Sequence, residues 1–108
     1  MTAAKFRSLA LEIPGAVESS HMNHPDFRID GKIFASLGYP DDGRAMVKLM
    51  PEQQRTFMKI APGVFGPCAG AWGKQGSTSV DLAAAKVDLL RAALEAASTN
   101  ITSKKKKA

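Results

Sequence analysis

Two histidines and a single cysteine are the residues of this 108-residue chain whose types first suggest chemistry. His21 and His24 stand three positions apart, and imidazole and thiolate groups are both common zinc ligands. A zinc site needs three or four ligands, however, and nothing in the sequence places Cys68 near the histidines. Residues three apart on a strand point to opposite faces, and Pro25 breaks the segment. We therefore interpret both histidines as turn residues and expect no metal and no cofactor.

The sequence does not supply a complete catalytic site built on a thiol or on carboxylates. A thiol nucleophile needs a base in contact with it, and the sequence supplies for Cys68 only the residue types. The acidic pairs Asp26/Asp30 and Asp41/Asp42 fall in predicted turns, where Asp is favoured because it bonds to nearby backbone. The chain is therefore expected to be a binding module rather than an enzyme.

A glycine-rich segment hints at phosphate binding. Gly73-Lys74 resembles the end of a P-loop, which also requires a glycine five positions before that glycine and Ser or Thr after the lysine. Those positions hold Cys68 and Gln75, so the motif fails twice. The glycines indicate tight turns around Trp72 instead, although Lys74 at an exposed loop tip could still contact an anion.

Residues 26–37 predict a β-hairpin that turns at Asp30-Gly31. In one register, a two-residue loop pairs Ile29 with Lys32 and mixes apolar and charged residues on both faces. In the other, a G1 bulge at the glycine pairs Arg28 with Lys32. We favour the second register because it separates apolar from polar residues across the pleat.

The favoured register places Arg28, Lys32 and Phe34 together on the outer face of a protruding ribbon. Cations beside an aromatic ring suit contacts to phosphates and bases of nucleic acid. Lys48, and Arg44 with it, could extend this patch from the next strand. The plainer interpretation is a solvated strand face whose charges protect a sheet edge.

The elements that would position these residues follow from hydrophobic spacing and from breakers. Helices are expected over residues 2–13, from residue 51 to about residue 61, and over residues 83–97. Strands are expected over residues 16–22, 44–50 and 77–82, in addition to the hairpin. The order predicts an α+β fold in which helices cover a short antiparallel sheet.

Charge and composition describe a single small domain of ordinary globular type. The net charge of +5 arises mostly from Lys104–Lys107, because eleven basic residues face ten acidic ones in the rest of the chain. We expect one domain over residues 1–97, followed by a disordered basic tail over residues 98–108. The lone cysteine and the lack of an apolar N-terminal run suggest a cytoplasmic protein without membrane association.

Four segments, taken in order, resemble the MmcQ/YjbR family of small bacterial proteins. They are FRSLALEIPGAVE (6–18), HMNHPDFRIDGKIFA (21–35), VKLMPEQQ (47–54) and GAWGKQGST (70–78). The resemblance implies a CyaY-like α+β fold with β-hairpin wings and a proposed role in DNA binding. It maps a wing onto residues 26–37. The end of the chain departs from the family, and the first helix lacks the acidic residues that frataxin-type iron binding would need.

The leading hypothesis is therefore a non-specific DNA-binding module that contacts backbone phosphates through Arg28, Lys32, Lys48 and Lys74. The alternative is a non-enzymatic scaffold that binds a protein or peptide. The sequence does not fix the oligomeric state.

Overall fold

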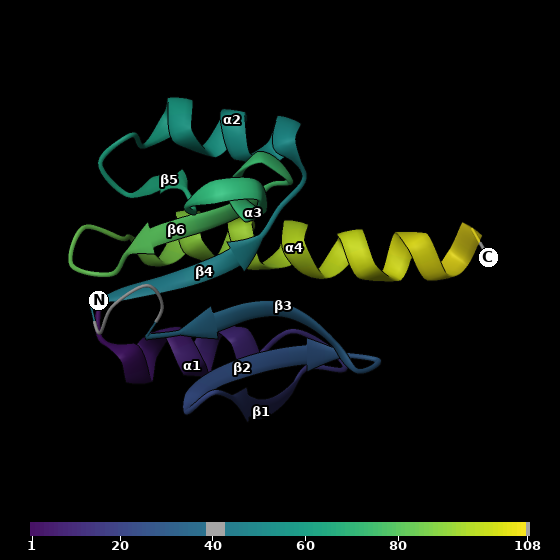
Figure 1. Cartoon of the computed structure of the whole chain (residues 1–108). Coiled ribbons are helices and arrows are strands. Elements are labelled where there is room, and N and C mark those ends of the chain that lie inside the picture. Colours follow the sequence, from purple (N-terminus) through teal and green to yellow (C-terminus); the bar gives the residue numbers. More distant parts are fainter. Residues whose placement is uncertain (39–42, 108) are drawn as a thin grey trace.

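The computed structural model describes residues 1–38 and 43–107, with side chains as far as Ser103. Within this part of the chain, four helices accompany one six-stranded sheet (Figure 1). The elements are α1 (Ala3–Leu11), β1 (Val17–His21), β2 (His24–Ile29), β3 (Lys32–Leu37), β4 (Arg44–Lys48), α2 (Pro51–Ile60), β5 (Phe65–Pro67), α3 (Gly70–Lys74), β6 (Ser77–Asp81) and α4 (Val87–Lys107).

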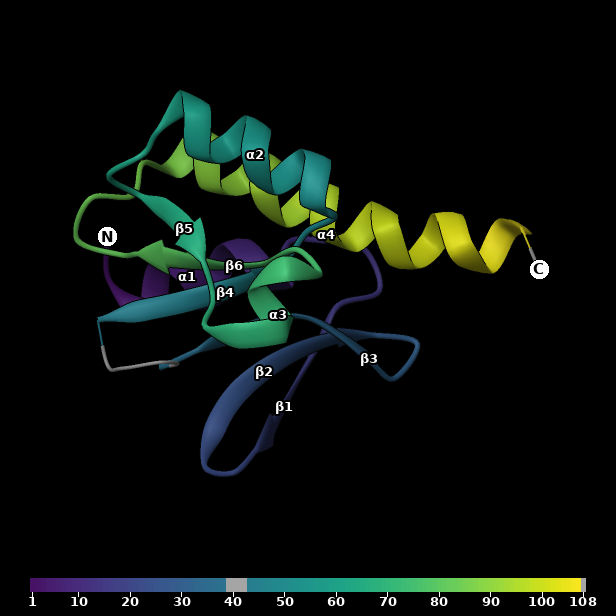
Figure 2. The ribbon, with the colours of Figure 1, turned by 45° about the horizontal axis from the view of Figure 1, so that its top comes forward.

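The sheet has the strand order β1-β2-β3-β4-β6-β5, and all neighbouring strands are antiparallel. The helices α1 and α4 cover one face behind β2, β3 and β4, and α2 packs over β5 and β6 (Figures 1 and 2). The short helix α3 lies on the opposite, front face, against β6 (Figures 1 and 2). The expected α+β class is thus confirmed. No helix in the described ranges is both long and apolar enough to cross a bilayer.

The first helix forms where the apolar spacing predicts it, and the last begins at Val87, four residues later than the predicted start at residue 83. The Thr2 hydroxyl accepts a hydrogen bond from the Lys5 amide and caps α1, which buries Phe6 and Leu9. Such a cap satisfies one of the amides that a helix start leaves without a partner. The buried side chains of α4 recur at helical spacing, and they are Leu90, Ala93, Leu94 and Ala97.

Helix α4 continues through residues 98–107, where the sequence suggests a disordered tail. Ser98 is buried, and Ile101 packs against the core. The Asn100 amide donates to Gln53 Oε1 of α2 at 2.8 Å. These contacts give the extra turns tertiary support, which a hydrophobic pattern that weakens after Ala97 does not reveal. The acidic pair Asp41/Asp42 and the Lys104–Lys107 side chains lie outside the described parts.

Two close backbone approaches occur in and directly after α3. A Cβ built on Gly73 would lie 1.8 Å from the Cys68 carbonyl oxygen, and one built on Gly76 would lie 2.0 Å from the Leu49 carbonyl oxygen. Buried Gln54 of α2 donates to the carbonyl oxygens of Gly73 at 3.0 Å and Ser77 at 3.1 Å. Glycine therefore lets three segments meet at backbone distance.

Replacing Gly73 by alanine should lower the free energy of unfolding by about 1–3 kcal/mol, because the new methyl group must displace main chain rather than a flexible side chain. Gly63→Ala is the matched control, since no atom lies within 4 Å of its Cβ position. That control should change stability by no more than about 0.5 kcal/mol. Urea unfolding measures both, and equal midpoints would contradict the close packing of α3.

Candidate nucleic-acid interface

The hairpin adopts the register that we did not favour. Ile29 pairs with Lys32, and the turn residues Asp30 (φ 53°) and Gly31 (φ 78°) both have positive φ. Positive φ at both central residues is typical of a type I′ turn, the two-residue loop whose twist matches that of paired strands. The predicted pairing of Arg28 with Lys32 is therefore wrong.

An irregularity further along the hairpin moves Phe34 from the expected outer face of the ribbon to the core. Phe27 pairs with Ala35 and Arg28 pairs with Ile33, so Phe34 has no partner in the ladder. The extra residue changes the phase of the strand. As a result, Phe34 and Ala35 are both fully buried. Phe34 belongs to the core and cannot serve as the exposed aromatic of the ribbon.

Arg28 is engaged by a buried carboxylate two residues before it. Arg28 Nε donates to Asp26 Oδ1 at 2.7 Å, and Nη2 donates to Oδ2 at 3.0 Å. His21 Nδ1 lies 2.7 Å from Oδ2, and the Asp26 side chain has no exposed surface. The hydrogen bonds from Arg28 hold the pKa of Asp26 below its ordinary value, against the opposing effect of burial and with a further contribution from His21. Much of the Arg28 charge is thereby balanced inside the protein.

The two histidines lie on the same face of the sheet, contrary to our expectation. A turn at Met22 and Asn23, both with positive φ, joins β1 to β2, and His21 and His24 are direct cross-strand partners. Residues three apart share a face when a two-residue turn separates them. No cluster of three His, Cys, Asp or Glu side chains suited to a metal ion occurs among the described residues. Burial raises the pKa of the Cys68 thiol, so this group is protonated at neutral pH.

A groove opens where the hairpin diverges from β4. The pairing of β3 with β4 covers only residues 35–37 and 45–47, so the tip of the hairpin extends past β4. The groove has a volume of about 650 Å³, within the range of about 300–1,000 Å³ common for ligand sites. We call it the hairpin groove. It is lined by Arg28, Gly31, Lys32, Ile33, Lys48, Leu49, Met50, Pro51, Gln75, Ser77, Ala97, Asn100 and Ile101.

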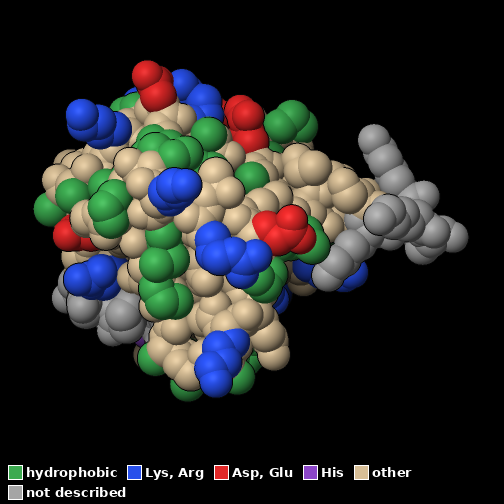
Figure 3. Space-filling view, turned by 90° about the horizontal axis from the view of Figure 1, so that it is seen from above, with side chains coloured by type: hydrophobic (Ala, Val, Ile, Leu, Met, Phe, Trp, Pro, Cys, Tyr) green, Lys and Arg blue, Asp and Glu red, His purple; other side chains and the backbone are tan. Residues whose placement is uncertain are grey.

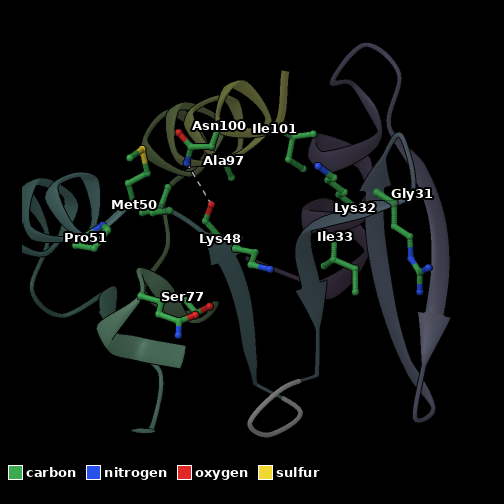
Figure 4. Close-up of a pocket in the computed structure, with 13 residues that line it drawn as sticks. Gly31, Lys32, Ile33, Lys48, Met50, Pro51, Ser77, Ala97, Asn100 and Ile101 are labelled. Carbon is green, nitrogen blue, oxygen red and sulfur yellow. Dashed lines mark hydrogen bonds between the residues drawn. The ribbon is translucent and has the colours of Figure 1, made fainter. Parts of the chain in front are cut away.

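Three of the four predicted contact residues therefore meet at one groove, and they come from three strands. Lys32 lies across from Ile101 of α4, and Lys48 extends from β4 into the gap (Figure 4). Asn100 Nδ2 donates to the Lys48 carbonyl oxygen at 3.4 Å, which ties α4 to the end of β4. Lys74 is exposed on α3 but does not line the groove.

Lys32 and Lys48 supply exposed positive charge at the hairpin groove. On the face shown in Figure 3, Lys and Arg side chains are spread singly among Asp and Glu side chains. Lys32 and Lys48 are both exposed, and unlike Arg28 neither forms a salt bridge with a carboxylate among the described residues. The groove can therefore present two ammonium groups to an anion. Arg28 lies beside them, held by its hydrogen bonds to Asp26.

Sequence reasoning assigned no role at this site to Trp72. Its side chain is 61% exposed, and Lys48 Nζ lies 6.0 Å from the centroid of its ring. The sequence did contain a hint of such a role, because Trp72 is the single tryptophan of the chain and stands in a glycine-rich segment near Lys74. We interpreted that segment as tight turns and close backbone packing around Trp72.

Comparisons with known proteins identify the family of this chain and a solved structure with a similar fold. The YjbR family model matches residues 11–98. The chain belongs to the YjbR family. A crystal structure of the Deinococcus radiodurans protein DR2400, described as a DUF419 domain, is similar to this YjbR chain with a TM-score of 0.75 and 19% sequence identity. The match covers 94% of this chain and 78% of that one, and at this identity it concerns the fold alone. A search of curated proteins found no match.

Proposed function

We propose that this YjbR protein is a non-enzymatic module that binds DNA through backbone phosphates at the hairpin groove. The observation that carries the proposal is that Lys32 and Lys48, from separate strands, line one groove together with Arg28. Phosphate contacts from lysine and arginine position a protein on DNA without reading sequence. Lys32 and Lys48 are the contacts, and Arg28 mainly orders the hairpin through Asp26.

The lysine run at the end of α4 is the competing source of affinity. Four neutralised phosphates would alone produce a slope of about −3.6 in a plot of log K against log salt for duplex DNA. A DNA-binding measurement on the intact chain therefore does not separate the groove from the run.

Duplex DNA titrations monitored by anisotropy should separate the two contributions. Replacing Lys32 and Lys48 together by alanine should weaken binding and reduce the magnitude of the salt slope by about 1.8, which corresponds to two phosphate contacts. Lys5→Ala/Lys59→Ala removes the same charge from two exposed lysines that do not line the groove.

A third variant replaces the four lysines of the run by glutamine. If this change abolishes binding and the groove variant behaves like the Lys5/Lys59 control, the groove is not the binding site. If the groove variant loses affinity in the presence of the intact run, the proposal is supported.

A second candidate is a scaffold that captures an extended peptide. Its support is β1, which lies at the edge of the sheet and whose five residues are all exposed. An open edge strand can accept an added strand through its main-chain hydrogen bonds. Such a partner would protect the amides of β1 from hydrogen exchange, and its affinity would not depend on Lys32 or Lys48.

A further inference from the structure

The exposed ring of Trp72 lies beside Lys48, one of the residues that line the hairpin groove. Lys48 lines the groove and also places its ammonium group 6.0 Å from the centroid of the Trp72 ring. One cation is thus shared between the groove and the ring. A chain of phosphates that contacts Lys32 and Lys48 would bring its bases to the neighbourhood of Trp72.

The backbone next to the exposed Trp72 ring is closely packed. The residue after it, Gly73, is packed against the Cys68 carbonyl group so closely that a Cβ would lie 1.8 Å from that oxygen. Buried Gln54 donates a hydrogen bond to the Gly73 carbonyl oxygen at 3.0 Å. The backbone that carries the ring is therefore fixed before a ligand binds, which reduces the backbone entropy lost on binding.

Resting on the proposed DNA-binding function, we propose that Trp72 stacks on an unpaired base and that the protein prefers single-stranded nucleic acid to duplex. Every base has a π-face, so stacking on an aromatic side chain tolerates any sequence. In a duplex, the base faces are already stacked on one another, and only an unpaired base can be offered to the ring. Lys48 beside the ring is placed to neutralise phosphate of the same strand.

Trp72 supplies its own signal, because it is the single tryptophan of the chain. The intact protein is titrated with an oligo(dT) of about 12 nucleotides, within the site sizes of about 4–16 nucleotides seen for single-strand binders. An oligomer of equal length with abasic sites carries the same phosphates without bases. We expect oligo(dT) to quench Trp72 fluorescence and to bind about 5- to 150-fold more tightly than the abasic oligomer, as expected for one stacked base.

Two variants, measured by anisotropy of labelled oligomers, test the ring directly. Trp72→Ala should remove the preference for oligo(dT) over the abasic oligomer, and Trp72→Phe should retain part of it. Both should fold, since the ring is mostly exposed, and circular dichroism checks this. Lys5→Ala is a control that should leave the preference unchanged.

The inference is overturned if oligo(dT) and the abasic oligomer bind equally, or if Trp72→Ala keeps the preference for bases. In either case, duplex binding that still depends on Lys32 and Lys48 leaves the proposed function standing. If no oligomer or duplex binds, the proposed function fails as well, and the inference fails with it.

Discussion

Replacing Phe34 by alanine should lower the free energy of unfolding by about 3–5 kcal/mol, the usual cost of removing a buried aromatic ring. The side chain is fully buried within the main core cluster, and its removal would leave a cavity that the surrounding sheet and helices can only partly fill. For a domain of this size, such a loss lowers Tm by about 15 °C or more. Thermal and urea unfolding would measure it.

Trp72→Ala is the matched control for this prediction. It also removes an aromatic ring, but one that is 61% exposed, so its cost should be within about 1 kcal/mol. The register favoured from the sequence makes the opposite prediction, because it exposes Phe34. If Phe34→Ala proved as stable as Trp72→Ala, the result would support the register favoured from the sequence and contradict the irregularity in the hairpin.

Replacing Asp26 by asparagine should cost about 2–3 kcal/mol in stability. Breaking a fully buried ion pair typically costs about 3–5 kcal/mol, and the smaller figure allows for the Arg28 side chain, which is 30% exposed and keeps access to water. Asparagine retains the shape of Asp26 but leaves Arg28 with a single neutral acceptor. Glu95→Gln, at an exposed position on α4, is the control for loss of one negative charge.

The pH dependence of stability gives this prediction a second readout. The pKa of Asp26 is lower in the folded protein than its ordinary value of 3.8, chiefly because of the hydrogen bonds from Arg28. Stabilisation by its ionised form is therefore fully present above the unfolded pKa and is lost as pH falls through the folded pKa. The difference in stability between the parent and Asp26→Asn should shrink as pH is lowered below about 4. A difference independent of pH would contradict the ion pair.

The candidate site was only partly predictable, and the reason lies in the hairpin. Arg28, Lys32 and Lys48 were chosen from alternation along single strands, and the structure does bring them to one groove. Alternation carried no information about the irregularity that buries Phe34. It also could not show that Asp26, assigned to a turn, would lie in a strand and bind Arg28.

Local sequence by itself determined the α+β class, the helix that Thr2 caps and the turn at Asp30-Gly31, because caps, turns and hydrophobic spacing act over a few residues. The strand register, the shared face of the two histidines and the length of α4 depend on partners distant in the chain. Only the tertiary structure decided these features, because burial and strand pairing stabilise contacts between residues that are far apart in the chain. The same long-range packing buried Phe34 and left Trp72 as the exposed aromatic residue beside Lys48.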